Sequence, residues 1–349
     1  MKATLLITGC GGHFMLDTIQ CYRNEDIRFR IIGVASKPDE YLRPYLDEYI
    51  EVPTSNTPGY VDLLLEICRD RKVDVLVPTI DEEIYPLYLR RNEFAEVGTL
   101  VSASEAGMYG SSKIAFLELL ESAGIRHPAY RVVETPFGLE RAARSLGYPE
   151  NPVCIKLPDK AGSRGFRILR EDAWDFHHFA NEKPSSRCVP MKQMMGIMRT
   201  MRKPTPVIVQ EYLPGDEYSV DLLAEHGKVK LITGRRNISL DNSIPTKSIL
   251  EKNEDAFRIS EEIVRAGKMD GNIGFDFIFD GNGEIVPIEV NARITATISL
   301  SAWGGCNLAY EQVARLLGRS VRHHDVKYGR GLSRRMRAIF IENIDKESE

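Results

Sequence analysis

The sequence has no apolar run that approaches the roughly 20 residues needed to cross a bilayer as a helix. Its first segment places Lys2 before a short apolar run that ends in glycines, which is too short and wrongly bounded for a signal peptide. These absences argue against the common membrane and secretory signals. We therefore expect a cytoplasmic protein with no membrane partner.

Cysteine is sparse, and its spacing argues against two kinds of site. No two cysteines form a CxxC pair, and no histidine stands at metal-ligand spacing from one. Neither a structural zinc site nor a disulfide framework is indicated, and a reducing compartment fits best. The six cysteines are Cys10, Cys21, Cys68, Cys154, Cys188 and Cys306.

The sequence also lacks an excess of positive charge. It has 46 lysines and arginines against 50 aspartates and glutamates, a net charge of −4. No global field favours nucleic acid, so we expect no nucleic-acid partner. With 349 residues the chain is too long for one hydrophobic core, and two or three packed units are expected. Small molecules become the expected partners.

Apolar β-branched runs alternate with amphipathic segments over the first hundred residues. This pattern indicates βαβ units and a parallel sheet, so we expect a Rossmann-like domain over residues 1–108. The glycine turn Gly9–Gly12 suggests a dinucleotide site, but the G-x-G-x-x-G spacing is incomplete and no acidic residue clearly closes the second strand. The segments are Thr4–Thr8, Phe14–Tyr22, Phe29–Ala35, Tyr60–Arg69 and Val73–Pro78.

An α+β organisation begins near Ser111. We predict helices over Lys113–Ala123 and Glu254–Ala266, and a hairpin that turns at Gly281–Gly283, where Asn-Gly is a strong tight-turn signal. This second domain is expected over residues 109–320, with a lid subdomain at about 130–208 and a C-terminal extension over 321–349. The predicted strands are VCIK, VIVQEY, EYSVDLLA, KVKLIT, IGFDFIFD and EIVPIEVN.

Methionines and basic residues crowd the segment between Asn181 and Pro206. Five methionines fall on one helical stripe. The preferred interpretation is a helix that packs on its own domain, and the alternative is a lid or a substrate-contacting insertion. The five are Met191, Met194, Met195, Met198 and Met201.

The strongest chemical signal is the segment GFDFIFDGNGEIVPIEVNAR, residues 274–293. Because side chains alternate along a strand, Glu289, Asn291 and Arg293 project from one face, and Asp276 lies on the paired strand. Two carboxylates and an amide oxygen form a hard-oxygen site of the kind that binds Mg²⁺ through phosphates. The alternative is a solvated sheet face, but the strands are otherwise core-like, and clustered polar residues there need a reason.

Here the sequence resembles the ATP-grasp superfamily, over about Leu5 to Gly318. IEVNAR is similar to the family's metal-binding E-x-N-x-R strand, and QEYLPGDEYSVD (Gln210–Asp221) is similar to its hinge strand. VCIKLPDKAGSRGF (Val153–Phe166) resembles the strand and small-residue loop that cover the triphosphate. The resemblance implies a mixed α/β and α+β protein, with a Rossmann-like domain followed by two α+β subdomains that clamp ATP.

The resemblance also implies roles for single residues. The expected Mg²⁺ ligands are Asp276, Glu289 and Asn291. Mn²⁺ is expected to be able to replace Mg²⁺ at this site. The adenine lies near main-chain groups of Glu211, Tyr212 and Leu213, and the ribose hydroxyls meet Glu217. The phosphates lie near Lys113, Lys156, Ser163 and Gly165.

Elementary chemistry supports the phosphate loop independently. Gly162, Ser163 and Gly165 let backbone N–H groups approach phosphate closely, and a neighbouring lysine offsets its charge. The alternatives are an ordinary turn and solvent-facing lysines, and for Lys113 an exposed helix start.

Two arginines and an acidic run complete the candidate site. Arg293 is expected to hold a substrate carboxylate or acyl phosphate, and Arg235, which follows the KVKLIT strand with Arg236, either faces the cleft or belongs to a solvated turn. The run 81–83 (Asp-Glu-Glu) follows a strand of the first domain, where α/β sheets place ligands. It either receives an ammonium group or starts a helix favourably.

These features predict an ADP-forming ligase that activates a carboxylate with Mg²⁺-ATP and joins it to an amine, or to a thiol. Within the superfamily the chain looks most like stand-alone relatives of the carbamoyl phosphate synthase large chain. Two other classes stay open, a non-catalytic nucleotide-binding regulatory module and an NAD-linked oxidoreductase. The sequence leaves the identity of both substrates open, and it leaves open a homodimer.

Overall fold

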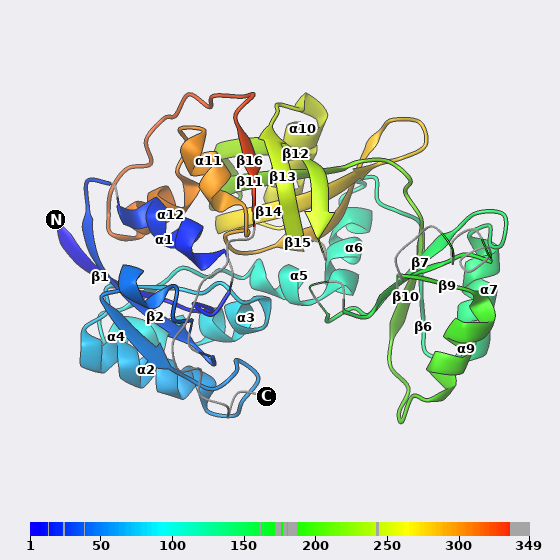
Figure 1. Cartoon of the computed structure of the whole chain (residues 1–349), viewed down its shortest axis with the longest axis horizontal. Coiled ribbons are helices and arrows are strands. Elements are labelled where there is room, and N and C mark those ends of the chain that lie inside the picture. Colours follow the sequence, from blue (N-terminus) through cyan, green and yellow to red (C-terminus); the bar gives the residue numbers. More distant parts are fainter. Residues whose placement is uncertain are drawn as a thin grey trace.

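The computed structural model of the chain contains three β-sheets (Figure 1). No helix among the residues it describes is both long and apolar enough to span a membrane. The described residues are 1–12, 14–23, 25–37, 39–160, 162, 164–171, 176, 180, 187–241 and 244–335.

The first sheet is parallel and has the strand order β3-β2-β1-β4-β5. Its strand β1 is buried on both faces, because Leu5 and Ile7 belong to one apolar core and Leu6 to another. The Rossmann-like start predicted from the alternating pattern is therefore confirmed. The elements are β1 (Lys2–Ile7), α1 (Met15–Arg23), β2 (Arg28–Ala35), η1 (Arg43–Tyr45), β3 (Glu48–Glu51), α2 (Tyr60–Arg71), β4 (Val75–Val77), α3 (Asp81–Leu89), α4 (Arg91–Glu96) and β5 (Leu100–Val101).

The glycine turn after β1 has a structural explanation. Gly9 adopts φ +66°, and a Cβ there would lie 2.4 Å from Oγ1 of Thr79. Only glycine fits both the left-handed backbone and this close approach. The turn therefore does not need a dinucleotide to account for its glycine.

The second sheet has the order β6-β10-β7-β8-β9 and forms a separate lobe with α7 and α9, at the right of Figure 1. Met191, Met194 and Met198 on α9 are buried in the core of this lobe. The interpretation of the methionine stripe as a packing helix is confirmed for the described residues; 181–186 lie outside them. The elements are β6 (Tyr130–Val133), α7 (Pro136–Ser145), β7 (Val153–Lys156), β8 (Phe166–Leu169), β9 (Cys188–Val189), α9 (Met191–Arg199) and β10 (Val207–Glu211).

The third sheet is antiparallel, with the order β15-β14-β11-β12-β13-β16. The predicted hairpins β11–β12 and β14–β15 are both present. The other elements near this sheet are α5 (Gly107–Ser111), α6 (Lys113–Ser122), α10 (Glu254–Ala266), α11 (Ile298–Trp303) and α12 (Leu308–Leu316). The strands are β11 (Glu217–Glu225), β12 (Lys228–Asp241), β13 (Ile244–Leu250), β14 (Gly271–Phe279), β15 (Ile285–Asn291) and β16 (Gly331–Ser333).

One prediction about this sheet needs correction. The strand KVKLIT was expected to end before Arg235, but β12 continues to Asp241, because the polar side chains of its second half find partners on β11. Within the expected C-terminal extension, β16 pairs with β13 at the sheet edge. The expected domain boundaries themselves stay predictions.

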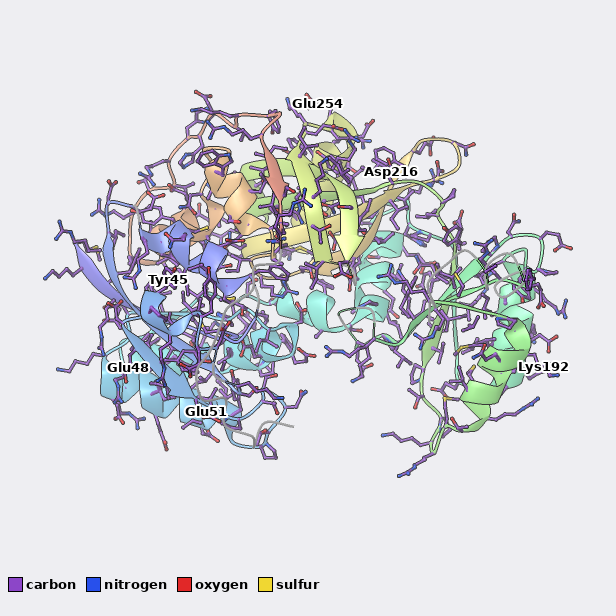
Figure 2. All side chains as sticks on the ribbon, in the orientation of Figure 1. Tyr45, Glu48, Glu51, Lys192, Asp216 and Glu254 are labelled. Carbon is purple, nitrogen blue, oxygen red and sulfur yellow. The ribbon has the colours of Figure 1, made fainter. Side chains whose placement is uncertain are left out.

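The first and third sheets share an apolar core. Leu5 of β1, Leu223 of β11 and Leu308 of α12 belong to one buried cluster. In Figure 2 the labelled Glu48 and Glu51 lie on the first sheet at the left, and Lys192 lies on the lobe of the second sheet at the right. The shared core fixes the first sheet against the third, so that residues at its strand ends reach the site.

Candidate active site

The described site residues predicted from the sequence all line one cleft, which has a volume of about 840 Å³. Strands of the second and third sheets contribute to its walls, together with α3 and the first residue of α6. Ser163 lies outside the described residues. The predicted residues that line the cleft are Lys113, Lys156, Gly165, Glu211, Tyr212, Leu213, Glu217, Arg235, Asp276, Glu289, Asn291 and Arg293.

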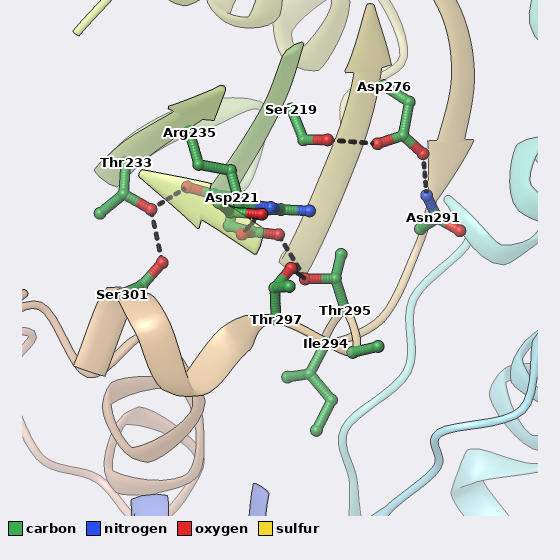
Figure 3. Close-up of polar contacts among 12 residues, drawn as sticks. Ser219, Asp221, Thr233, Arg235, Asp276, Asn291, Ile294, Thr295, Thr297 and Ser301 are labelled. Atoms are coloured by element: carbon green, nitrogen blue, oxygen red, sulfur yellow. Dashed lines mark hydrogen bonds and ion pairs between the residues drawn. The ribbon is translucent and has the colours of Figure 1, made fainter. Parts of the chain in front are cut away.

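Strands β14 and β15 bring the acidic residues together. Asp276 stands opposite Glu289 in the ladder, so both carboxylates project from one sheet face. Asp276 accepts hydrogen bonds from Oγ of Ser219 at 2.7 Å and from Nδ2 of Asn291 at 3.0 Å (Figure 3). Burial, and next the charge of Glu289, raise the pKa of Asp276. An anionic pair of this kind favours a bound cation.

The oxygen donors fit Mg²⁺. No group of three His, Cys, Asp or Glu side chains is placed to hold a metal within the described part of the chain. Two carboxylates and one amide are instead what is expected when phosphates and water complete the coordination shell. Asp276, Glu289 and Asn291 are the residues that would hold the ion.

Two lysines approach the same face from different elements. Lys113, the first residue of α6, places Nζ 2.7 Å from Oε1 of Glu289 and donates to the carbonyl of Lys160 at 2.8 Å. Lys156 ends β7 and is partly buried, and burial lowers the pKa of its ammonium group. Neither lysine is the solvent-facing residue that was the alternative interpretation.

The small-residue loop after β7 depends on one glycine. The carbonyl of Gly165 accepts a hydrogen bond of 2.9 Å from the backbone N–H of Leu157. Gly165 has φ +68°, and a Cβ there would lie 2.8 Å from the Leu157 side chain. Gly162 also has a positive φ, +63°, but no atom of the described residues beyond its chain neighbours lies within 4 Å of its Cβ position.

The hinge segment begins at the end of β10. Glu211, Tyr212 and Leu213 line the cleft, and Gly215 approaches the third sheet so closely that a Cβ would lie 2.4 Å from the carbonyl oxygen of Phe279. Glu217, the first residue of β11, accepts a 2.8 Å hydrogen bond from Nδ2 of Asn237.

The carboxyl group of Glu217 has a pKa well above its ordinary value. Burial, then the charge of Asp276, raise its pKa to about 7, although the hydrogen bond from Asn237 acts in the other direction. A buried carboxyl with this environment is stabilised in its charged form by additional hydrogen-bond donors, such as ribose hydroxyls.

Arg293 does not stand free in the cleft. It donates to both carboxylate oxygens of Asp81, from Nε and Nη2, at 2.7 Å each. Its Nη1 donates to the carbonyl of Ile294 at 3.1 Å. A free guanidinium ready to take a substrate carboxylate was expected here, but an aspartate from the first sheet occupies its fork.

The three acidic residues at the start of α3 make different contacts. Asp81 lines the cleft and pairs with Arg293, which neither earlier interpretation foresaw. Glu83 is buried and accepts hydrogen bonds from the backbone N–H groups of Thr79 and Ile80, so it starts the helix. Glu82 forms an ion pair with Arg164, with 3.8 Å between its Oε1 and Nη2 of the arginine.

Arg235 is buried and ion-paired with Asp221 of β11, whose other oxygen accepts a 2.8 Å hydrogen bond from Thr295 (Figure 3). Arg236 also lies within β12, where its partly exposed side chain pairs with Glu251, so the expected solvated turn is wrong for both arginines. Sequence reasoning missed Asp221 and Thr295. The alternation of Glu217, Ser219 and Asp221 along β11 was a usable signal, because these positions share a strand face.

Comparison with known families bears on the fold of the chain. Residues 203–336 match a family model described as an ATP-grasp domain in the biosynthetic pathway with the Ter operon, and residues 5–102 match the PylC-like N-terminal domain. The carbamoyl phosphate synthase large chain of Agathobacter rectalis is 28% identical over 193 residues, which are 52% of this chain and 16% of that protein. The arginine-specific large chain of Bacillus subtilis is 23% identical over 195 residues, with the same coverage.

The chain thus spans less than a fifth of the length of these two relatives. Among solved structures, an ADP complex of N5-carboxyaminoimidazole ribonucleotide synthetase superposes with a TM-score of 0.69 at 16% identity, covering 94% of this chain and 80% of the other. The biotin carboxylase domain of Hydrogenobacter thermophilus 2-oxoglutarate carboxylase, solved with MgADP and bicarbonate, gives 0.70 at 14% identity, covering 94% and 73%. At these identities the superpositions show the fold.

The predicted fold is therefore confirmed from two sides. The family models match the N-terminal sheet and the strands that carry the carboxylates, and the superpositions cover nearly the whole chain. The comparisons thus support an ATP-grasp domain, matched by its family model over residues 203–336, behind a PylC-like N-terminal domain.

Proposed function

We propose that the protein is an ATP-dependent ligase that phosphorylates a substrate carboxylate, releases ADP, and lets an amine displace phosphate from the acyl phosphate. One observation carries this proposal. Paired carboxylates, two lysines and two arginines, contributed by separate elements, line one cleft in a fold that binds ADP or ATP in its solved relatives. A thiol in place of the amine is compatible with the same site.

The nucleotide would lie between the second and third sheets. Glu211 to Leu213 offer main-chain groups to adenine, and Glu217 accepts from the ribose hydroxyls. Lys113 lies beside the carboxylates, Lys156 lines the same cleft from the second sheet, and both would face the phosphates. Glu289 and the carbonyl of Lys160 hold the Lys113 ammonium group before ATP arrives, so little reorganisation of this group accompanies the reaction.

Mg²⁺ bound with the nucleotide would supply charge neutralisation to the γ-phosphate. Asp276, Glu289 and Asn291 would hold it, and Mn²⁺ fits the same oxygen donors. Lys113 would exchange its contact with Glu289 for the phosphates when the ion is bound. The chain itself contributes positioning and charge, because phosphoryl transfer needs no nucleophilic side chain.

The chemistry requires the substrate carboxylate to attack the γ-phosphorus in line. Arg235 and Arg293 are the cations beside the metal face that could orient it. Because Asp81 occupies the fork of Arg293, the pair would act as a rigid dipolar unit unless substrate displaces the aspartate. The acyl phosphate would then be open to a neutral amine.

Hydroxylamine tests this proposal directly. With Mg²⁺-ATP and a competent acid, it should trap the acyl phosphate as a hydroxamate even without the amine partner. With ¹⁸O in the carboxylate, one label should appear in the released phosphate, because the carboxylate oxygen is the attacking atom. AMP and pyrophosphate as products would show adenylation instead, and ATP binding without turnover over a broad panel of acids would favour the regulatory module.

A further inference from the structure

The tip of the β12–β13 hairpin carries an aliphatic strip that the nucleotide chemistry does not use. Ile238 is 47% exposed and Leu240 is 39% exposed, and with Ile244 of β13 they line the cleft. Single exposed aliphatic residues are common on protein surfaces. Three that converge on one wall of a binding cleft need a ligand that covers them.

A β-bulge aims this strip into the cleft. From Arg235 and Asn237, strict alternation would place Ile238 and Leu240 on the opposite face of β12. The register with β13 shifts on both sides of Ser239, so that consecutive residues from Asn237 to Leu240 line the cleft. Bulges beside binding sites commonly redirect a side chain in this way.

Arg334, one residue after β16, fixes the strip at the substrate end. Its Nη1 donates to the carbonyl of Pro245 at 2.7 Å, and its Nη2 donates to the carbonyl of Ala296 at 2.6 Å. One guanidinium therefore joins the hairpin tip to the loop that follows Arg293. The guanidinium also stacks on Phe14, with its carbon 4.2 Å from the ring centroid.

Three arginines in this part of the molecule are already paired with aspartates. Arg235 pairs with Asp221, Arg293 pairs with Asp81, and Arg334 lies 3.7 Å from Asp17. A phosphate group would bring nearly two further negative charges. Three arginines that each face an aspartate do not supply the surplus positive charge that a phosphorylated substrate requires. A single carboxylate brings only one negative charge and therefore needs less surplus positive charge.

Resting on the ligase function proposed above, we infer that the substrate seated against the hairpin is a carboxylic acid with an apolar side group, and is not a phosphorylated compound. The side group would cover Ile238, Leu240 and Ile244, and the carboxylate would point toward Arg235. A solved relative from Aspergillus clavatus is in complex with ADP and 5-aminoimidazole ribonucleotide, superposing with a TM-score of 0.66 at 16% identity. The two proteins would then share a fold and differ in the chemistry of this subsite.

Shape-matched acids provide the test. Leucine and asparagine form one pair, and 4-methylpentanoate and succinamate form another, because each pair differs in polarity at nearly constant shape. ADP release measures turnover, and calorimetry in the presence of Mg²⁺ and a non-hydrolysable ATP analogue measures binding. We expect the apolar member of at least one pair to be preferred by about ten-fold or more, the range typical of apolar pockets.

Polar variants of similar size test the strip itself. Ile238→Thr and Leu240→Asn should each reduce that preference several-fold while leaving nucleotide affinity unchanged. Ile197→Thr is the matched control, because Ile197 is 44% exposed on α9 and does not line the cleft. It should leave the preference as in the wild type.

The outcomes separate this inference from the ligase proposal. Equal or reversed preference, binding of neither member of either pair, or variants that weaken only nucleotide binding would overturn the apolar subsite. Preferential binding of the apolar acid without ADP release or hydroxamate would support the subsite and refute the ligase chemistry.

Discussion

Arg293 and Asp81 form a two-point ion pair between residues 212 positions apart in the sequence, with both hydrogen bonds at 2.7 Å. Arg293 follows the strand that carries Glu289 and Asn291, and Asp81 is the first residue of α3 beside the N-terminal sheet. Their side chains are only 19% and 16% exposed. The first sheet therefore sets the orientation of an arginine in the cleft.

A double-mutant cycle should reveal this coupling. Asp81→Asn and Arg293→Met should each lower the free energy of unfolding, because each leaves a poorly solvated charge or donor without its partner. The double variant should be more stable than the sum of the two losses predicts, by about 1–3 kcal/mol. Urea denaturation measures this, and strictly additive losses would show that the pair contributes no coupling.

The metal assignment predicts a loss of turnover without a loss of fold. Glu289→Gln and Asn291→Ala should each reduce ATP turnover at least about 100-fold, since each removes charge or an oxygen donor from the cation site. Asn282→Ala, in the turn of the same hairpin, is the control and should turn over ATP normally. Circular dichroism should be unchanged in all three. Near-normal turnover of Glu289→Gln and Asn291→Ala at ordinary Mg²⁺ would contradict the assignment.

Local sequence rules predicted well which of these residues share a strand face. Alternation along a strand was enough to group Glu289, Asn291 and Arg293, and the Asn-Gly turn fixed the hairpin that sets Asp276 opposite Glu289. Both signals depend on only a few neighbouring residues. They can therefore be recognised without knowledge of the tertiary structure.

Tertiary contacts account for what the sequence did not predict. Nothing near Arg293 in the sequence indicates that Asp81 occupies its fork. The extension of β12 beyond Thr233 was missed because its polar residues suggest a turn until Asp221 and Glu217 are placed beside them. The bulge near Ser239 likewise depends on pairing with β13.

The phosphate loop offers a comparison between two glycines. Gly165→Ala combines a strained left-handed backbone with a Cβ placed 2.8 Å from Leu157, whereas Gly162→Ala adds only the backbone strain. We expect Gly165→Ala to raise the KM for ATP about ten-fold or more, and Gly162→Ala to raise it less. Steady-state kinetics at saturating Mg²⁺ measures both. Equal effects would show that the contact with Leu157 does not matter for closing the loop.

Nucleotide should also change the dynamics of this loop. We expect Mg²⁺-ATP to slow amide exchange at residues 158–166, since small residues close over phosphates only when these are present. Hydrogen exchange followed by mass spectrometry resolves this segment. Unchanged exchange on saturation would count against a role for the loop in binding phosphate.

Glu217 provides a prediction about pH. Burial, followed by the charge of Asp276, raises its pKa to about 7 in the folded protein, from an ordinary value of 4.5. Between these values the folded state holds a proton that the unfolded state has lost. The contribution of this group to stability is therefore fully present below about pH 4.5 and is lost as pH rises through about 7.

Glu217→Gln should remove this dependence, because the amide has the shape of the protonated carboxyl and does not titrate. Without nucleotide, the variant should match the wild type near pH 5 and exceed it by on the order of 1–2 kcal/mol near pH 8. Urea denaturation at several pH values measures the difference, with Glu118→Gln on the exposed face of α6 as the control. Mg²⁺-ATP should reduce the variant's advantage, since ribose hydroxyls donating to Glu217 favour its charged form. A stability difference that stays constant from pH 5 to pH 8 would show that Glu217 titrates normally.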